Sequence, residues 1–345
     1  MTAIRTVAEL EQVVGSRPLG ALMKSVRTLD EHCVRLLALS PFAVVGFAAA
    51  DGRARATIAG GAPGFARVLD PTHLRIELDE AATVDPSVGC ALLFFIPGLG
   101  ETLRVNGRAT IEGATLTVTV EEAFAHCAKA LLRSSFWSLQ EQSTQAGALE
   151  GEASGVLAEP HVREKLGRTP FVALVSWDAQ GRADASPKGD PPSFLRIWDG
   201  KLAVPDRPGN RRTDTFHNVL EQPRVALLAL APGDDWILEV SGVASLTVEP
   251  SLLASMAVQG KTPKIALLLE AQDADLRRSQ ALAKAVPWDP ARSVPREELP
   301  DMAGVFVDHV KQNDRRGVAA SAIRALLSKG MMRRALAHDY EKNRY

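Results

Sequence analysis

The sequence predicts a mainly β protein built from two tandem, small Greek-key barrels with short inserted helices, followed by a helical tail. An internal repeat covers most of the chain, and each copy contains short apolar segments separated by turn residues. Each copy also has a helical segment between strands rather than a helix after every strand. That pattern favours antiparallel barrels over a parallel β–α–β sheet.

The repeat is visible without any gap over its first part. Residues 40–70 (SPFAVVGFAAADGRARATIAGGAPGFARVLD) align with residues 169–199 (TPFVALVSWDAQGRADASPKGDPPSFLRIWD). The match resumes between residues 85–111 and residues 221–246. Since self-similarity at this scale indicates duplicated structural units, we expect two homologous domains.

The strands of the second repeat follow from its turns. FVALVSW and RADASP flank a turn in which Gly181 can adopt positive φ, and FLRIWD and LAVP flank Asp199-Gly200, so both pairs are predicted hairpins. RVALLAL and WILEVSGVASLTV give two more strands, joined across Pro232-Gly233. One helix is predicted at about residues 212–221.

We expect three regions: a degenerate barrel repeat at residues 1–145, a second barrel repeat at 156–290 and a helical extension at 291–345. The segment 140–155 (QEQSTQAGALEGEASG) is polar and rich in small residues, which is typical of a domain boundary. The tail from 311 to 345 carries nine Lys/Arg against three Asp/Glu and an apolar helical face. We expect it to dock on the barrel or on a second chain, and a membrane-surface helix is the weaker alternative because that face is modest.

Composition excludes several classes of function. The 345 residues are 46% hydrophobic and carry a net charge of −1, so no global field recruits nucleic acid or an acidic membrane. The three cysteines form no CxxC pair, which argues against a disulfide framework or a structural zinc site. No HxxxH or HExxH spacing links the histidines, so no metal site is predicted. Without a visible signal peptide or membrane span, we expect a cytoplasmic protein.

A cationic turn before the predicted helix is the most informative local feature. PDRPGNRRTD (205–214) combines three arginines with two prolines that stiffen the turn and a glycine that permits close backbone approach. Asn210 or Thr213 can cap a helix that begins near Arg212. A helix N-terminus beside guanidinium groups favours phosphate, although a solvated basic turn is the alternative.

Comparison of the repeats favours the phosphate hypothesis. In the first repeat the corresponding connection is only DEAATV (79–84), without arginine, and ATIAGG (56–61) replaces ASPKGD (185–190) and deletes the equivalent of Lys188. Loss of cations from both loops of one repeat indicates a binding site kept in the other.

These segments resemble a known family. SPKGDPPSF, PDRPGNRR, NVLEQPRVALL, IPGLGETLRVNG and HCAKALLRSSFW are similar to the FMN-binding split-barrel proteins related to pyridoxamine 5′-phosphate oxidase, especially probable FMN-dependent enzymes of unassigned substrate. The resemblance covers about residues 20 to 290. It implies a six-stranded split barrel, usually a homodimer with two FMN molecules at its interface, in which one subunit grips the phosphate and the other completes the pocket.

The resemblance also implies roles for particular residues. The arginines of the turn would bind the FMN phosphate, the strand around Lys188 would follow the edge of the isoalloxazine ring, and residues of the first repeat would complete the pocket. The predicted cofactor-binding residues are Ser186, Pro187, Lys188, Asp206, Arg207, Asn210, Arg211, Arg212, Thr213, Thr102, Lys129 and Arg133. Trp137 either stacks near the ring or belongs to the core, and the equivalent Trp288 favours the core.

The two halves of the family's site are divided between the repeats. Motifs similar to the phosphate grip lie in the second repeat, while those similar to the partner's contribution, at Glu101, Thr102, Arg104, Lys129 and Arg133, lie in the first. We therefore expect a fused pseudo-dimer with one FMN pocket, as a monomer or as a homodimer.

The expected activity is that of an FMN-dependent oxidoreductase acting on a small substrate, with NADH or NADPH as a possible partner. No catalytic residue is predicted, because the flavin supplies the difficult chemistry. A deazaflavin- or haem-binding barrel and a non-catalytic flavin-binding or structural protein stay open as alternatives.

Overall fold

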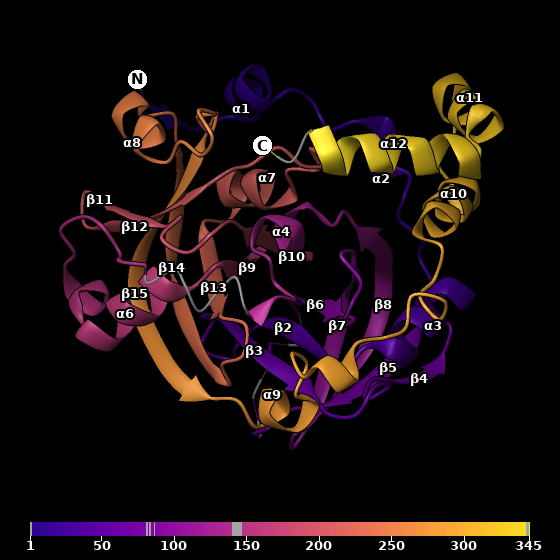
Figure 1. Ribbon diagram of the computed structural model, residues 1–345, viewed down its shortest axis with the longest axis horizontal. Helices are drawn as coiled ribbons and strands as arrows, with labels where there is room; N and C mark the ends of the chain where they lie inside the picture. The colour runs from indigo at the N-terminus through magenta and orange to yellow at the C-terminus, as the bar shows by residue number, and fades with distance from the viewer. Residues whose placement is uncertain (1, 81, 83, 86, 140–146, 343–344) are drawn as a thin grey trace.

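The computed structural model describes residues 2–80, 82, 84–85, 87–139, 147–342 and 345, and most of its core is β-structure (Figure 1). Part of the predicted linker, residues 140–146, lies outside the described residues. Two antiparallel sheets lie side by side, each formed by one repeat, and helices cover their outer faces (Figure 1). No helix among the described residues is long and apolar enough to cross a membrane.

The sheet of the first repeat has the strand order β3-β2-β6-β7-β8-β5-β4. Its strands are β2 (Phe42–Ala48), β3 (Ala54–Gly60), β4 (Arg67–Asp70), β5 (His73–Glu77), β6 (Gly89–Phe95), β7 (Thr102–Glu112) and β8 (Thr115–His126).

The sheet of the second repeat has the order β10-β9-β13-β14-β15-β12-β11, which matches the first strand for strand. Its strands are β9 (Phe171–Trp177), β10 (Ala183–Gly189), β11 (Arg196–Trp198), β12 (Lys201–Pro205), β13 (Arg224–Leu230), β14 (Trp236–Thr247) and β15 (Ala266–Arg278). Short β1 (Ala3–Ile4) pairs with β14, so the start of the chain packs on the second repeat.

The matching strand orders agree with a tandem duplication, but each sheet has seven strands along this path where six are predicted. The strands absent from the prediction are β8 and β15. In β15 the apolar start ALLL gives way to the polar stretch EAQDADLRR, so the alternation that indicates a strand is weak, although it pairs with β14 over almost its whole length.

The two sheets share a buried apolar core. Phe42 and Phe95 of the first repeat stack with ring centroids 4.8 Å apart, and Phe95 meets Phe171 of the second repeat edge-on at 5.6 Å. A fully buried phenylalanine contributes about 1.5–3 kcal/mol to stability. At the centre, a Cβ on Gly46 would lie 2.3 Å from a methyl group of Val175, its counterpart in the alignment, so the two β-strands meet here at a residue without a side chain.

Helices cover both ends of the sheets. Near the site lie α1 (Val7–Val14), α4 (Lys129–Arg133), α7 (Asp214–Glu221) and α8 (Pro250–Ser255). Others are α2 (Leu19–Leu22), α3 (Glu31–Leu39), α6 (Pro160–Arg168) and α9 (Gln280–Ala285), with 3-10 turns η1 (Gly155–Ala158) and η2 (Pro290–Arg292). The tail forms α10 (Met302–Gln312), α11 (Val318–Leu326) and α12 (Lys329–Lys342), as the predicted helical extension requires.

Candidate functional site

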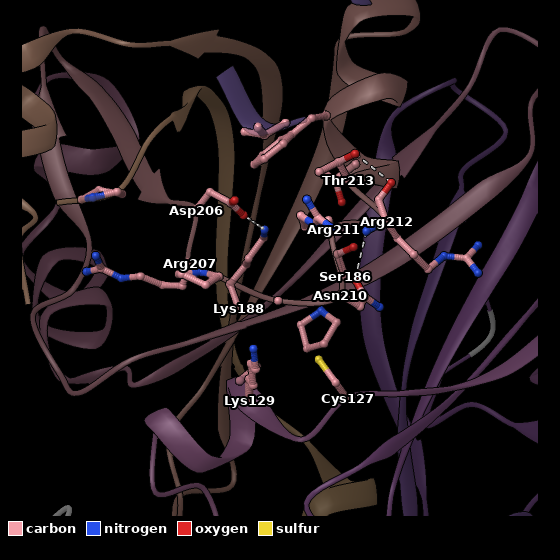
Figure 2. Close-up of a pocket in the computed structure, with 18 of the residues that line it drawn as sticks. Cys127, Lys129, Ser186, Lys188, Asp206, Arg207, Asn210, Arg211, Arg212 and Thr213 are labelled. Atoms are coloured by element: carbon pink, nitrogen blue, oxygen red, sulfur yellow. Dashed lines mark hydrogen bonds and ion pairs between the residues drawn. The ribbon is translucent and has the colours of Figure 1, made fainter. Parts of the chain in front are cut away.

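A cavity of about 650 Å³ lies where the two repeats meet, and the predicted residues converge on it (Figure 2). Its wall combines the cationic turn and β10 of the second repeat with the end of β8 and α4 of the first. The predicted residues that line it are Ser186, Pro187, Lys188, Asp206, Arg207, Asn210, Arg211, Arg212, Thr213, Lys129 and Arg133. Only Thr102 does not. Its buried hydroxyl lies outside this wall and lacks a hydrogen-bond partner among the described residues, while Arg104, two positions later on β7, does line the cavity.

The cationic turn has a strained backbone at its C-terminal end. Arg211 and Thr213 have φ of 55° and 52°, in the left-handed region that L-residues seldom adopt. The side-chain oxygen of Asn210 accepts a hydrogen bond from the amide of Arg212 at 3.0 Å. Helix α7 starts at Asp214 rather than near Arg212, and Thr213 occupies the N-cap position without a side-chain cap.

The three arginines of the turn are not equivalent, and Arg207 is largely a structural residue. Its guanidinium bonds the carboxylate of Asp190 and donates to the main-chain oxygen of Met256 at 2.8 Å. Burial raises the pKa of Asp190, while the charge of Arg207 opposes that rise. Removal of either partner would leave an uncompensated buried charge, so breaking this pair would destabilise the folded protein.

Arg212 connects the second repeat to the first. It donates to Asp214 at 2.7 Å and to Glu122 of β8 at 3.0 Å, and its guanidinium lies 3.9 Å from the ring centre of Phe124. Burial alone would raise the pKa of Asp214, but Arg212 and Arg104 outweigh it and hold that pKa below its usual value. These contacts fix the turn against β8.

Arg211 is exposed, and among the described residues no hydrogen-bonding or ion-pair partner is found for it. It is therefore the guanidinium of the turn that can meet an incoming anion without first leaving a carboxylate.

Strand β10 brings polar groups to the centre of the cavity. Ser186 donates to Asp184 at 2.8 Å, and Asp184 also bonds Arg104 across the boundary between the repeats. The ammonium group of Lys188 lies 2.8 Å from Asp206 and 4.8 Å from the ring centre of Phe216 (Figure 2). Because side chains alternate along a strand, Ser186 and Lys188, two residues apart on β10, lie on the same face.

Helix α4 supplies the first repeat's cations. Arg133 donates to the main-chain oxygens of Gly189 and Pro208, both at 3.0 Å, and so holds the cationic turn against the first repeat. Lys129 is buried and pairs with Asp339 of α12 at 2.8 Å. The two lie four residues apart on one helix, as predicted. Trp137 is part of the core, where it packs on Phe136 at 5.0 Å and donates to the main-chain oxygen of Leu99.

Sequence reasoning missed several residues in the cavity wall. Two of them are Arg104, which the resemblance assigns to the partner's half but not to the binding residues, and His126 at the end of β8. Burial and the charge of Arg104 lower the pKa of His126 well below its usual value, which favours a neutral imidazole. The others come from the loop before β15 and from the tail: Lys261, Lys264, Asp339 and Tyr345.

The residues that correspond to this site when the two repeats are exchanged in the alignment form ion pairs of reversed sign. In the alignment of the two repeats, Arg55 corresponds to Asp184 and Arg104 corresponds to Glu239. Arg55 donates to Glu239 at 2.8 and 3.0 Å, and Arg277 donates to the same carboxylate at 3.1 Å. Asp79 accepts from the amide of Ala281 at 2.8 Å. Groups that face one another here neutralise one another.

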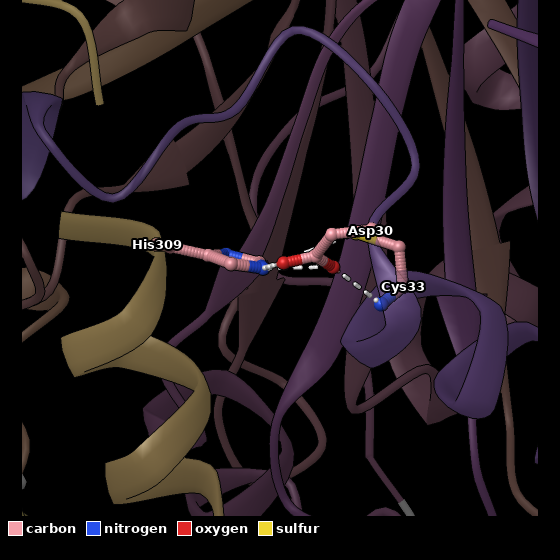
Figure 3. Close-up of side chains that lie close together, drawn as sticks. All are labelled: Asp30, Cys33 and His309. Atoms are coloured by element: carbon pink, nitrogen blue, oxygen red, sulfur yellow. Dashed lines mark hydrogen bonds and ion pairs between the residues drawn. The ribbon is translucent and has the colours of Figure 1, made fainter. Parts of the chain in front are cut away.

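A separate cluster of Asp30, Cys33 and His309 joins the tail to the first repeat (Figure 3). Asp30 accepts from the amide of Cys33 at 2.9 Å and pairs with His309 at 3.2 Å. The carboxylate is thus already used as the cap of α3 and as the partner of α10. We interpret the cluster as an ion pair that fastens α10 to the first repeat.

Comparison with known proteins finds a family similar to the second repeat. The family model described as pyridoxamine 5′-phosphate oxidase matches residues 158–288. Among curated proteins, none is significantly similar in sequence.

Solved structures with some likeness each cover about a third of this chain. HupZ of Group A Streptococcus has 13% identity and a TM-score of 0.29, covering 35% of this chain and 94% of its own. The heme storage protein HutZ of Vibrio cholerae has 16% identity and a TM-score of 0.27, covering 35% and 94%. An FAD-binding protein of Mycobacterium smegmatis has 14% identity and a TM-score of 0.25, covering 33% and 88%.

Such low values decide nothing about ligand or reaction. The family match does bear on the fold, because residues 158–288, which form most of the second repeat, are similar to the family described as pyridoxamine 5′-phosphate oxidase.

Proposed function

We propose that the protein is an FMN-binding oxidoreductase that transfers two electrons between a small substrate, or a nicotinamide, and the flavin. The observation that carries the proposal is the convergence of the cationic turn, β10 and α4 on one cavity between the repeats. Its volume of about 650 Å³ lies within the range of about 300–1,000 Å³ that small-molecule sites occupy.

The donors of the cavity fit a phosphorylated ring. Arg211 has no partner among the described residues, and the buried Nε of Arg104 likewise lacks one. Arg211 with the backbone of the turn would hold the phosphate, because charge-assisted hydrogen bonds to phosphate are strong and directional. Arg207 and Arg212 would keep the turn in place through their carboxylate partners rather than make the first contact.

The remaining residues would orient the ring and control its surroundings. Ser186, Pro187 and Lys188 would lie along one edge, and α4 would close the cavity from the first repeat. A bound flavin would supply the two-electron chemistry, and nearby cations would favour negative charge on its reduced form. His126, held neutral, would offer a hydrogen-bonding ring nitrogen to a ligand in the cavity.

Purification followed by cofactor identification tests the proposal. We expect absorbance maxima near about 370 and 450 nm, and release of FMN identified by its mass. A band near about 400 nm would indicate haem, and a blue-shifted flavin band would indicate a deazaflavin. Reduction by NADH or NADPH, followed at the flavin band, then tests oxidoreductase activity. Protein that binds FMN in vitro but is reduced by neither a nicotinamide nor any small reductant would instead support a non-catalytic flavin-binding role.

A further inference from the structure

One wall of the cavity comes from a segment that only the second repeat has. In the first repeat, β7 and β8 are joined by Gly113 and Ala114 alone. In the second, residues 248–265 separate β14 from β15 and include α8. Lys261 and Lys264 of this segment line the cavity. The repeat that holds the phosphate turn therefore also holds two further cations at the same cavity.

The segment 248–265, which carries Lys261 and Lys264, is firmly attached to the cationic turn. Val258 and Lys261 exchange two backbone hydrogen bonds, of 3.1 and 2.9 Å, around a tight turn at Gln259 and Gly260. Asp206 donates from its amide to the oxygen of Ile265 at 3.0 Å. Arg207 donates to the oxygen of Met256. Lys261 and Lys264 are thus presented from a short, doubly anchored loop beside the turn.

The charges in the cavity wall are strongly unbalanced. Of the described residues, three carboxylates line it (Asp206, Asp214 and Asp339) against nine basic side chains: Arg104, Lys129, Arg133, Lys188, Arg207, Arg211, Arg212, Lys261 and Lys264.

Most of these cations have a carboxylate partner, but those at the rim do not. Among the described residues, Lys264 and Arg211 have no acidic partner, and Lys261 bonds the main-chain oxygen of Tyr345 at 2.7 Å. Lys264 and Arg211 therefore leave positive charge uncompensated at the rim of the cavity, which favours entry of an anion.

A single phosphate accounts for only part of this excess. Its charge is about −1.5 to −2 near neutral pH, and Arg211 with the amides of the turn can hold it. Lys261 and Lys264 remain. We propose that they form a second anion subsite, which takes a second phosphoryl group of a ligand that shares the cavity with the first. This inference rests on the proposed function.

Two sources could supply that group. A dinucleotide flavin such as FAD would carry it on the cofactor, and a nucleotide such as NADP⁺ would bring it with the substrate. In either case the ligand would displace the main-chain oxygen of Tyr345 from Lys261.

The test compares wild type with Lys261→Ala/Lys264→Ala in the full chain. FMN and FAD are titrated into apo protein by flavin fluorescence, and NADP⁺ into FMN-saturated protein by calorimetry. We expect the double variant to lose at least tenfold in affinity for FAD or for NADP⁺, and FMN affinity to stay within about twofold. Lys201→Ala/Lys284→Ala removes the same charge outside this cavity and should change none of the three.

Three results would overturn the subsite. Unchanged affinity for both FAD and NADP⁺ would mean that the lysines hold no second anion. An equal loss of affinity for FMN would show that the lysines contact the first phosphate. It would overturn the second subsite but not the proposal that this cavity binds FMN. If wild type binds no flavin, the proposed function is wrong, and the subsite is tested without flavin by titrating pyrophosphate into the apo protein. Equal pyrophosphate affinity of wild type and the double variant is the third result that would overturn the subsite.

Discussion

Arg207, Arg211 and Arg212 lie in one short turn, yet the structure gives them three different environments. Arg207 is buried against Asp190, Arg212 bridges Asp214 and Glu122, and Arg211 is exposed without a partner among the described residues. The sequence could place all three near a phosphate, but it could not assign their partners. Asp190 directly follows β10 and Glu122 lies in β8, and only the folded chain brings them within reach of the turn. Substitution of Arg211 can therefore test phosphate binding, and substitution of Arg207 or Arg212 can separately test structural support of the turn.

Arg211→Ala should weaken FMN binding without destabilising the protein. The substitution removes a charge-assisted hydrogen bond, which is worth about 1.5–3 kcal/mol, so the Kd for FMN should rise by at least tenfold. Fluorescence titration gives the Kd and urea denaturation gives the free energy of unfolding, which should change by less than about 0.5 kcal/mol. Arg67→Ala, on an exposed strand away from the cavity, is the control. A normal FMN affinity for Arg211→Ala in folded protein would contradict the assignment.

Arg212→Ala should act first on stability. It leaves Glu122 without its ion-pair partner and Asp214 with only Arg17 and Arg104, and breaking a buried pair in this way costs about 3–5 kcal/mol. Glu122 is partly exposed, so we expect a loss of about 2–3 kcal/mol in urea denaturation. A substitution that left stability unchanged would show that Arg212 does not support the boundary between the repeats.

At the level of elements, α10 is held to α3 by Asp30 and His309, and this contact should respond to pH. Burial alone would raise the pKa of Asp30, but hydrogen bonds from His309 and the Cys33 amide outweigh it, so the pKa lies well below its usual value. A carboxyl group with a lowered folded pKa stabilises the protein above its unfolded pKa, and that stabilisation is lost as pH falls.

Asp30→Asn should therefore lower the free energy of unfolding at pH 7 by about 1–3 kcal/mol and flatten its decline between about pH 5 and 2. Asn still caps α3, so the change isolates the charge. Urea denaturation at several pH values measures it, with Glu31→Gln as the neighbouring exposed control. Parallel pH profiles for wild type and Asp30→Asn would rule out this ion pair as a source of acid sensitivity.

The sequence predicts most elements where local signals are strong, although β8 is missed despite the apolar alternation in TLTVTV. The hairpins around Gly181 and Asp199-Gly200 and the helix after the cationic turn follow from turn chemistry and periodicity. β15 was missed because its outer half is polar, and pairing with β14, a long-range contact, makes it a strand. Asp339 and Tyr345 carry no motif. They line the cavity because α12 packs across it, which depends on the tertiary arrangement of the tail.

For the whole molecule, the contrast between the two equivalent positions predicts a stoichiometry. One has a cavity with uncompensated cations, and the other has Arg55, Glu239, Arg277 and Asp79 already satisfied by one another or by backbone. Titration with FMN should saturate at about one flavin per chain, measured by absorbance of the bound and filtered fractions. Saturation at two would show that the first repeat still binds phosphate through its short connection.

The two ion pairs of reversed sign, Arg104 with Asp184 and Arg55 with Glu239, also determine which repeats can associate. Were two copies of the second repeat to associate as the repeats of this chain do, Glu239 of each would face Asp184 of the other, both of them buried carboxylates. Two copies of the first repeat would set Arg104 against Arg55. Like charges confined together in a poorly solvated interface repel strongly, whereas the unlike repeats are complementary at both positions. The charges at this interface therefore disfavour association of two like repeats and favour association of the two unlike repeats, which the chain joins covalently.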